Sequence, residues 1–113
     1  MARFDPEKFE DKYANYFTEL QRAYKNAFET MNEAYDSELV HAIDQQVLAE
    51  SEPFYEDGRF TVELPEDPVD RVTAMADEGK VEATLERYVD EIEAELYAVF
   101  GLEPPSEGAE SEG

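Results

Sequence analysis

Residues 52–64 read EPFYEDGRFTVEL and decide the fold class, because they predict a β-hairpin in a chain that otherwise predicts helices. Asp57 and Gly58 form a pair that tolerates the positive φ angles of a tight two-residue turn. From Phe60 to Leu64, apolar residues alternate with polar ones, which is typical of a strand with one buried face. We therefore expect a hairpin over these residues.

Helices are predicted on both sides of the hairpin. The Asp5-Pro6 pair is typical of a helix start, since Asp caps free N–H groups and Pro suits the first helical position. Apolar residues then recur every three or four positions with no Gly or Pro between them, which predicts one long helix over about residues 6–34. A second helix is expected over about residues 37–50 and a last one over about residues 78–100.

The expected order of elements is helix, helix, hairpin, helix. For residues 71–76 the sequence leaves two alternatives open, a third strand, which we favour, and a helix. These elements define the α+β class, in which helices cover a small antiparallel hairpin or three-stranded sheet. One domain is expected over residues 1–102, since 113 residues are too few for two cores. Residues 103–113 hold only Glu, Pro, Ser, Gly and Ala, and predict a disordered acidic tail.

The net charge of the chain is strongly negative. Thirty acidic residues against nine basic ones give a formal net charge of −21, and only four of the acidic residues lie in residues 103–113. The excess is therefore spread through the folded part. At molar salt the Debye length falls to about 3 Å, which screens the repulsion while carboxylates keep the surface hydrated. The composition predicts a halophilic protein rather than a mimic of nucleic acid.

The sequence also disfavours several kinds of site. The absence of cysteine excludes disulfides and thiolate metal sites. Since neither a signal peptide nor an apolar run of the roughly 18–20 residues that span a bilayer is found, we expect a cytoplasmic protein without a membrane partner. The shortage of Lys and Arg disfavours nucleic-acid binding. Because hydrolase, phosphate-loop and calcium-loop motifs are missing, we expect no catalytic residue, cofactor or metal.

Three segments carry a resemblance to a known family: residues 5–9 (DPEKF), 19–28 (ELQRAYKNAF) and, above all, 37–48 (SELVHAIDQQVL). Over about residues 4–102 the chain resembles a small family of acidic haloarchaeal proteins of unknown function. The resemblance implies a haloarchaeal source, in agreement with the charge. It implies no activity, so no catalytic or binding residue is carried over.

The single histidine of the chain, His41, defines one candidate site. Asp44 and Gln45 follow it at helical spacings of three and four, so the three side chains lie near one face, and Tyr55 of the hairpin is a further candidate. Such a group is suited to bind a small ligand or to transfer protons. One histidine with scattered carboxylates offers too few good ligands for a dedicated metal site. A solvent-facing or hydrogen-bonded structural histidine is the interpretation we favour.

Aromatic residues define a second candidate site. Eight of the fourteen rings lie in residues 4–35, and one edge of the predicted first helix carries four of them: Phe17, Tyr24, Phe28 and Tyr35. These rings belong either to the core alone, which we favour, or partly to an interface with a second copy or another protein. The basic residues of this helix, Lys12 among them, are expected on its polar side in ion pairs within the helix.

The sequence leaves the biochemical function unknown and orders three hypotheses. The first is a small non-enzymatic protein that acts through protein–protein contact, with an unknown partner or as a homodimer. The second is a small-ligand binder or enzyme centred on His41. The third and weakest is a ribosome- or nucleic-acid-associated factor, which would need a coherent positive stripe on its surface.

Overall fold

The structure is a computed structural model that describes residues 4–72 and 76–103. Within these residues it has five α-helices and one two-stranded antiparallel sheet, which confirms the α+β class. The elements are, in chain order, α1 (Pro6–Phe9), α2 (Lys12–Asn15), α3 (Phe17–Ala34), α4 (Ser37–Gln46), the 3₁₀ turn η1 (Leu48–Glu50), β1 (Glu52–Glu56), β2 (Arg59–Glu63), the 3₁₀ turn η2 (Asp70–Val72) and α5 (Glu78–Val99).

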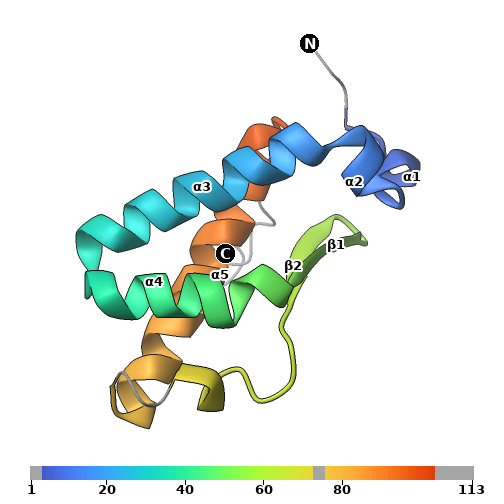
Figure 1. The fold of residues 1–113 in the computed structure, drawn as a ribbon. Coiled ribbons are helices and arrows are strands. Elements are labelled where there is room, and N and C mark those ends of the chain that lie inside the picture. Colours follow the sequence, from blue (N-terminus) through green and yellow to red (C-terminus); the bar gives the residue numbers. More distant parts are fainter. Residues whose placement is uncertain (1–3, 73–75, 104–113) are drawn as a thin grey trace, which may run out of the picture.

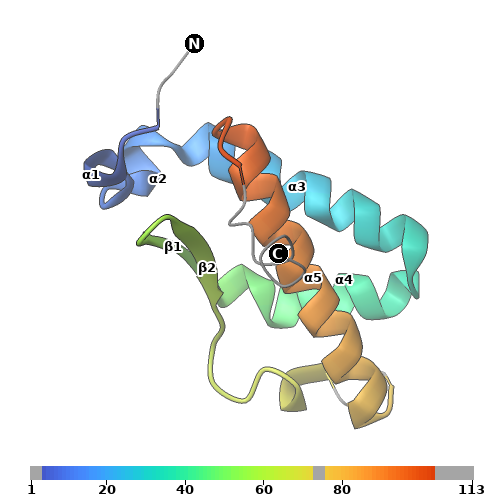
Figure 2. The same cartoon turned by 180° about the vertical axis from the view of Figure 1, so that it is seen from behind.

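Three helices form the body of the molecule. α3 and α4 run antiparallel, and α5 crosses both of them, with its more extensive contact against α3 (Figures 1 and 2). The hairpin lies beside the far end of α4, where β1 contacts α1 and β2 contacts α5. Residues from the start, middle and end of the chain therefore meet around the hairpin.

The core follows the predicted helical stripes. Most of its buried apolar residues in α3, α4 and α5 are spaced by three or four positions, so each helix turns one face inward, and Leu39–Val40 and Leu96–Tyr97 are adjacent pairs. The buried apolar residues of these helices are Leu20, Ala23, Ala27, Met31, Leu39, Val40, Ile43, Val81, Leu85, Tyr88, Ile92, Leu96 and Tyr97. The small side chains of Ala23 and Ala27 bring α3 close to its neighbours, which explains why the α3–α5 contact is the main one.

The prediction of one continuous helix over residues 6–34 is wrong in its first third. α1 ends at Phe9, and Tyr16 has a non-helical backbone between α2 and α3. The Asp5 N–H donates to the Tyr16 hydroxyl over 2.9 Å. Residues eleven positions apart in an unbroken helix would be separated by about 16 Å along the axis. The chain must therefore fold back on itself for this hydrogen bond to form.

The fold-back completes a cluster of aromatic rings, here called the ring cluster. Its members are Phe4, Phe9, Tyr16, Tyr55, Phe60, Tyr97 and Phe100. Phe60 of β2 is 2% exposed, and its ring centroid lies 4.9–5.6 Å from those of five other members. Aromatic pairs at such separations add about 0.5–1.5 kcal/mol beyond their burial. These contacts stabilise the fold-back, in which some helical hydrogen bonds are lost at the breaks.

The predicted hairpin is confirmed. Asp57 and Gly58 have φ angles of 53° and 81°, as a two-residue primed turn requires, and Tyr55 pairs with Phe60 across the strands. The Phe60 N–H donates to the hydroxyl of Tyr97 over 2.9 Å. Tyr97 of α5 is 6% exposed, and its hydroxyl satisfies this backbone group of β2 within the core.

The favoured third strand is wrong where the structure describes it. Residues 70–72 form η2, and the sheet of the described segments has two strands. Residues 73–75 lie outside the described residues, as do residues 104–113 of the predicted acidic tail.

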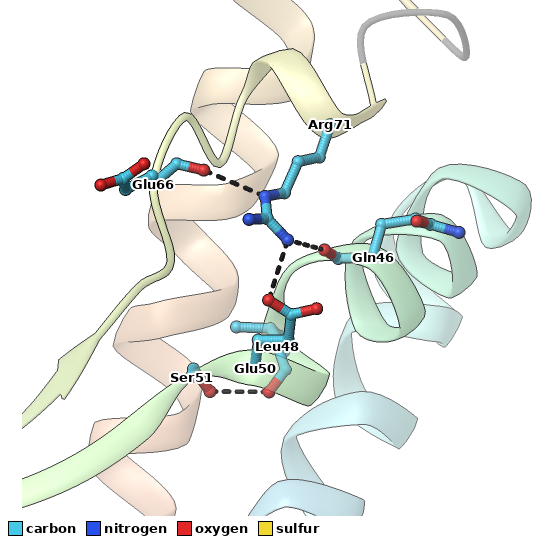
Figure 3. A network of polar contacts seen from close by, with 6 residues as sticks. All are labelled: Gln46, Leu48, Glu50, Ser51, Glu66 and Arg71. Carbon is cyan, nitrogen blue, oxygen red and sulfur yellow. Dashed lines mark hydrogen bonds and ion pairs between the residues drawn. The ribbon is translucent and has the colours of Figure 1, made fainter.

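Arg71 explains why the segment after the hairpin stays against α4 (Figure 3). Its Nε donates to the Glu66 carbonyl over 3.0 Å, and a terminal nitrogen donates to the Gln46 carbonyl over 3.3 Å and to a Glu50 carboxylate oxygen over 3.0 Å. Gln46 is the last residue of α4, where carbonyls lack partners within the helix and a cation is favourable. One guanidinium thus joins three segments.

Candidate functional site

The polar candidates of α4 have separate neighbours. His41 is exposed, and its ring packs edge-on against Phe28 of α3 with 4.9 Å between centroids. Asp44 accepts a hydrogen bond of 3.4 Å from the Tyr88 hydroxyl of α5. Gln45 is exposed. His41 and Asp44 therefore contact different helices rather than converging on one hollow.

Tyr55, the fourth polar candidate, lies in the ring cluster. Its ring centroid is 4.7 Å from that of Phe4 and 4.9 Å from that of Phe60. The structure gives it no described contact with His41. Within residues 4–72 and 76–103, no group of three or more His, Asp or Glu side chains is arranged to hold a metal ion.

Tyr88 of α5 is a fully buried core residue that carries a polar hydroxyl. Burial, and then the negative charge of Asp44, raise its pKa well above the usual range of a tyrosine. The hydroxyl thus stays protonated and donates to Asp44. The available signal was a tyrosine within an otherwise aliphatic stripe, since a buried hydroxyl needs a partner.

The four aromatic candidates divide into two groups. Phe17 and Tyr24 line the same groove, described below. Phe28 is half-buried against His41, and Tyr35, just after α3, is 42% exposed. The structure therefore brings together two of the four predicted interface residues.

The groove separates α2 and the first half of α3 from η1 and β1. It has a volume of about 220 Å³, and we call it the aromatic groove. Its lining residues are Tyr13, Phe17, Leu20, Gln21, Tyr24, Ala49, Ser51 and Pro53. The Ser51 hydroxyl donates to the Leu48 carbonyl over 2.7 Å and accepts from the Tyr24 hydroxyl over 3.1 Å. This chain of hydrogen bonds holds the Tyr24 ring in place.

Lys12 corrects the prediction that the basic residues of the first helix pair within it. The residue is only 5% exposed, and its ammonium lies 2.8 Å from a Glu52 carboxylate oxygen of β1. The same nitrogen lies 4.8 Å from the centroid of the Phe54 ring and 5.2 Å from that of Tyr13. Because the backbone breaks on both sides of α2, Lys12 turns toward the hairpin.

A second hollow beside Lys12 is rich in carboxylates. It has a volume of about 400 Å³, and we call it the acidic cleft. Its lining residues are Pro6, Glu7, Phe9, Glu10, Lys12, Glu52, Phe54 and Tyr55. The linings of the cleft and the groove meet at Lys12, whose ammonium lies 4.8 Å from the ring centroid of Phe54 in the cleft and 5.2 Å from that of Tyr13 in the groove. The cleft therefore adjoins the groove at Lys12, and we treat the two hollows as one surface.

Exposed rings gather on this surface. Among the described residues, four large apolar side chains are at least 38% exposed: Tyr13 at 55%, Phe17 at 51%, Tyr35 at 42% and Phe54 at 38%. Three of them line the groove or the cleft. Sequence reasoning missed Tyr13 and Phe54. The signal for Phe54 was its place on the strand face opposite to Pro53 and Tyr55, because alternate residues of a strand face opposite sides.

Comparison with family models gives a match over residues 1–103, to a family of unknown function (DUF5783). The chain belongs to this family. The predicted membership of a family of unknown function is thereby confirmed, while the haloarchaeal source stays a prediction. Because the DUF5783 match spans α1 to α5, the ring cluster, groove and cleft all lie within the family's region. Neither the curated proteins nor the solved structures give a match. None of the helices in the described segments is long and apolar enough to cross a membrane.

Tyr24 should remain protonated at a pH where an exposed tyrosine ionises. Burial, only partly countered by the hydrogen bond with Ser51, raises its pKa to about 12, against about 10 in the unfolded chain. Between these pH values the unfolded state releases a proton that the folded state keeps. The contribution of Tyr24 to the free energy of unfolding is therefore fully present below about pH 10 and is lost as the pH rises toward about 12. An absorbance titration of phenolate formation should show a late step that Tyr24→Phe removes. Ionisation of all seven tyrosines near pH 10 in the folded protein would contradict this.

Proposed function

We propose that the chain is a small non-enzymatic binding protein that docks another polypeptide in the aromatic groove. The observation that carries this proposal is the exposure of Tyr13 and Phe17 beside a hollow, on a chain whose net charge is −21. A large apolar side chain left in water forgoes about 1.5–3 kcal/mol that burial would supply. Contact with a partner recovers that free energy, and exposed apolar patches mark such contacts.

The walls of the groove support docking because they are already formed. Leu20 is 4% exposed and belongs to the core, while Tyr24 is held through Ser51. A partner therefore meets a surface that loses little further side-chain freedom on binding, which favours affinity. Tyrosines and other rings in such pockets carry most of the binding energy of protein interfaces.

The proposal extends to the setting of the protein. We propose that one α+β domain over residues 1–102 works in a salt-rich cytoplasm of haloarchaeal type. The support is the composition, since the negative charge is spread through the folded part and needs screening.

Other functions have less support. His41 is exposed and packs against Phe28, and the candidate Tyr55 has its contacts in the ring cluster. For nucleic-acid binding, a coherent positive stripe is needed, yet Lys12 is buried and Arg71 is engaged with Glu50. Docking of a polypeptide in the aromatic groove is the function that the geometry favours.

Site-specific photocrosslinking tests the proposal. A photoreactive phenylalanine analogue replaces Phe17, which lines the groove, or Tyr35, which is similarly exposed but lines neither the groove nor the cleft. In the producing cells at their native salt, we expect one discrete crosslinked species from position 17 and none from position 35. The matched control separates binding in the groove from the general adhesiveness of exposed rings.

The mass of the crosslinked species identifies the occupant. A product of twice the chain mass, together with a dimer in sedimentation experiments, assigns the groove to a second copy. A heavier or lighter product assigns it to a different polypeptide. Equal crosslinking from positions 17 and 35, or none from position 17, would overturn the proposal.

A further inference from the structure

We infer that the partner inserts a Lys or Arg side chain into the acidic cleft, beside the apolar side chain that fills the aromatic groove. This inference rests on the proposed function and specifies the chemistry of the partner. It makes the partner a basic and apolar segment rather than a second copy of the chain.

The cleft carries negative charge that the described structure does not neutralise. Three carboxylates line it, from Glu7, Glu10 and Glu52, and Lys12 is the one base among its described lining residues. The Lys12 ammonium already contacts Glu52 over 2.8 Å. Within the described part of the chain, the carboxylates of Glu7 and Glu10 have no ion-pair partner, and both residues are exposed. They are therefore available to a cation from outside.

The cleft also offers aromatic surface to a cation. The chain itself places an ammonium there, with the Lys12 nitrogen 4.8 Å from the centroid of the Phe54 ring. Phe54 is still 38% exposed and Tyr55 is half-buried at the same hollow. An ammonium or guanidinium is attracted to a ring face and to a carboxylate at the same time. The residues that hold Lys12 thus show how the cleft would hold a second cation.

Charge decides which occupant is favoured. A second copy would bring its own net charge of −21 to a cleft that is already negative. A basic segment brings the complementary sign, which speeds encounter and rejects acidic competitors. Because the cleft adjoins the groove, a cationic residue next to an apolar residue in one segment reaches both hollows.

Three capped peptides provide the test: RLFR, its neutral analogue QLFQ and its acidic analogue ELFE. Each is titrated into the ¹⁵N-labelled full chain at the lowest salt that keeps it folded, and amide shifts report the affinity and the site. We expect RLFR to bind about tenfold more tightly than QLFQ, with ELFE the weakest. Shifts should appear at Glu10 and Phe54 as well as along the groove.

Two sets of variants assign the effect. The Glu7→Gln, Glu10→Gln double variant should reduce the affinity for RLFR to that for QLFQ, and should leave QLFQ binding unchanged. The matched control is Glu82→Gln with Glu86→Gln on α5, which removes the same charge from exposed residues outside the cleft and should keep most of the preference. Circular dichroism checks that each variant is folded. Phe17→Ala should weaken the binding of all three peptides.

Each negative result of the peptide experiment would overturn a different part of the proposal. Equal binding of RLFR and QLFQ in the groove overturns the basic partner and leaves the docking function in place. Shifts confined to the cleft and unaffected by Phe17→Ala overturn the role of the groove. The absence of binding by any peptide at millimolar concentration overturns the inference, and photocrosslinking at position 17 then decides separately whether the docking function holds.

Discussion

The protein should unfold when it is moved from molar salt to dilute buffer at neutral pH. Two like charges 10 Å apart repel by about 0.4 kcal/mol in salt-free water. A net charge of −21 supplies many such pairs, and their sum is comparable to the roughly 5–15 kcal/mol that stabilises a small domain. At 1 M salt the Debye length of about 3 Å removes most of this repulsion. Far-ultraviolet circular dichroism during dialysis should follow the loss of the helices.

A charge-reduced variant distinguishes screening from other effects of salt on apolar burial. Glu82, Glu86 and Asp90 are exposed and follow one another at four-residue spacing on α5, where like charges repel along the helix. Replacing all three by their amides should shift the unfolding midpoint to lower salt. A melting temperature independent of salt in the parent chain would contradict the electrostatic explanation.

After the transfer to dilute buffer, the substitution Phe60→Ala should cause the next largest loss in the free energy of unfolding. Phe60 is 2% exposed and its ring contacts five other members of the ring cluster, so truncation leaves a cavity among rings from three parts of the chain. Removal of a buried phenylalanine typically costs about 3–5 kcal/mol. Unfolding should be followed in urea at fixed high salt, because guanidinium is itself a screening salt.

The neighbouring strand residue provides the control. Thr61 is exposed on the same strand, and Thr61→Ala should change the free energy of unfolding by less than about 0.5 kcal/mol. A loss below about 1 kcal/mol for Phe60→Ala would mean that the ring cluster does not hold the hairpin to the N-terminal segment and α5.

Features that depend on a few neighbouring residues could be predicted from the sequence. Asp5, Asp36 and Asp77 accept hydrogen bonds from backbone N–H groups at the starts of α1, α4 and α5, as an N-cap residue does. The Asp57-Gly58 pair forms the predicted turn. Each signal acts within about four residues, so no knowledge of the tertiary structure was needed.

Features that depend on distant contacts could not be predicted. Nothing local interrupts the apolar spacing between residues 6 and 34, and the breaks at both ends of α2 are stabilised by the hydroxyl of Tyr16 and by the rings of Phe60 in β2 and of Phe100 just after α5. The burial of Lys12 likewise depends on Glu52, forty positions away. A helical wheel for one continuous helix therefore placed Lys12 on the polar side, whereas the structure buries it beside Glu52 of β1.

Some residues of the candidate site could be predicted from the sequence, and others could not. Phe17 and Tyr24 were identified because α3 is a regular helix over both positions, so a helical wheel places their side chains correctly. Tyr13 was missed because it belongs to the broken segment, where the wheel no longer applies. Phe54 was missed because its role depends on a hollow that α1 and α2 complete.

The fold-back at the amino end has a practical consequence for anyone who isolates the partner. Pro6 and Glu7 line the acidic cleft, and Phe4 is packed in the ring cluster. An affinity tag or fluorescent fusion attached at the amino end would begin only a few residues from the proposed docking surface and would compete with the partner for it. Bait proteins should therefore carry their label after Gly113.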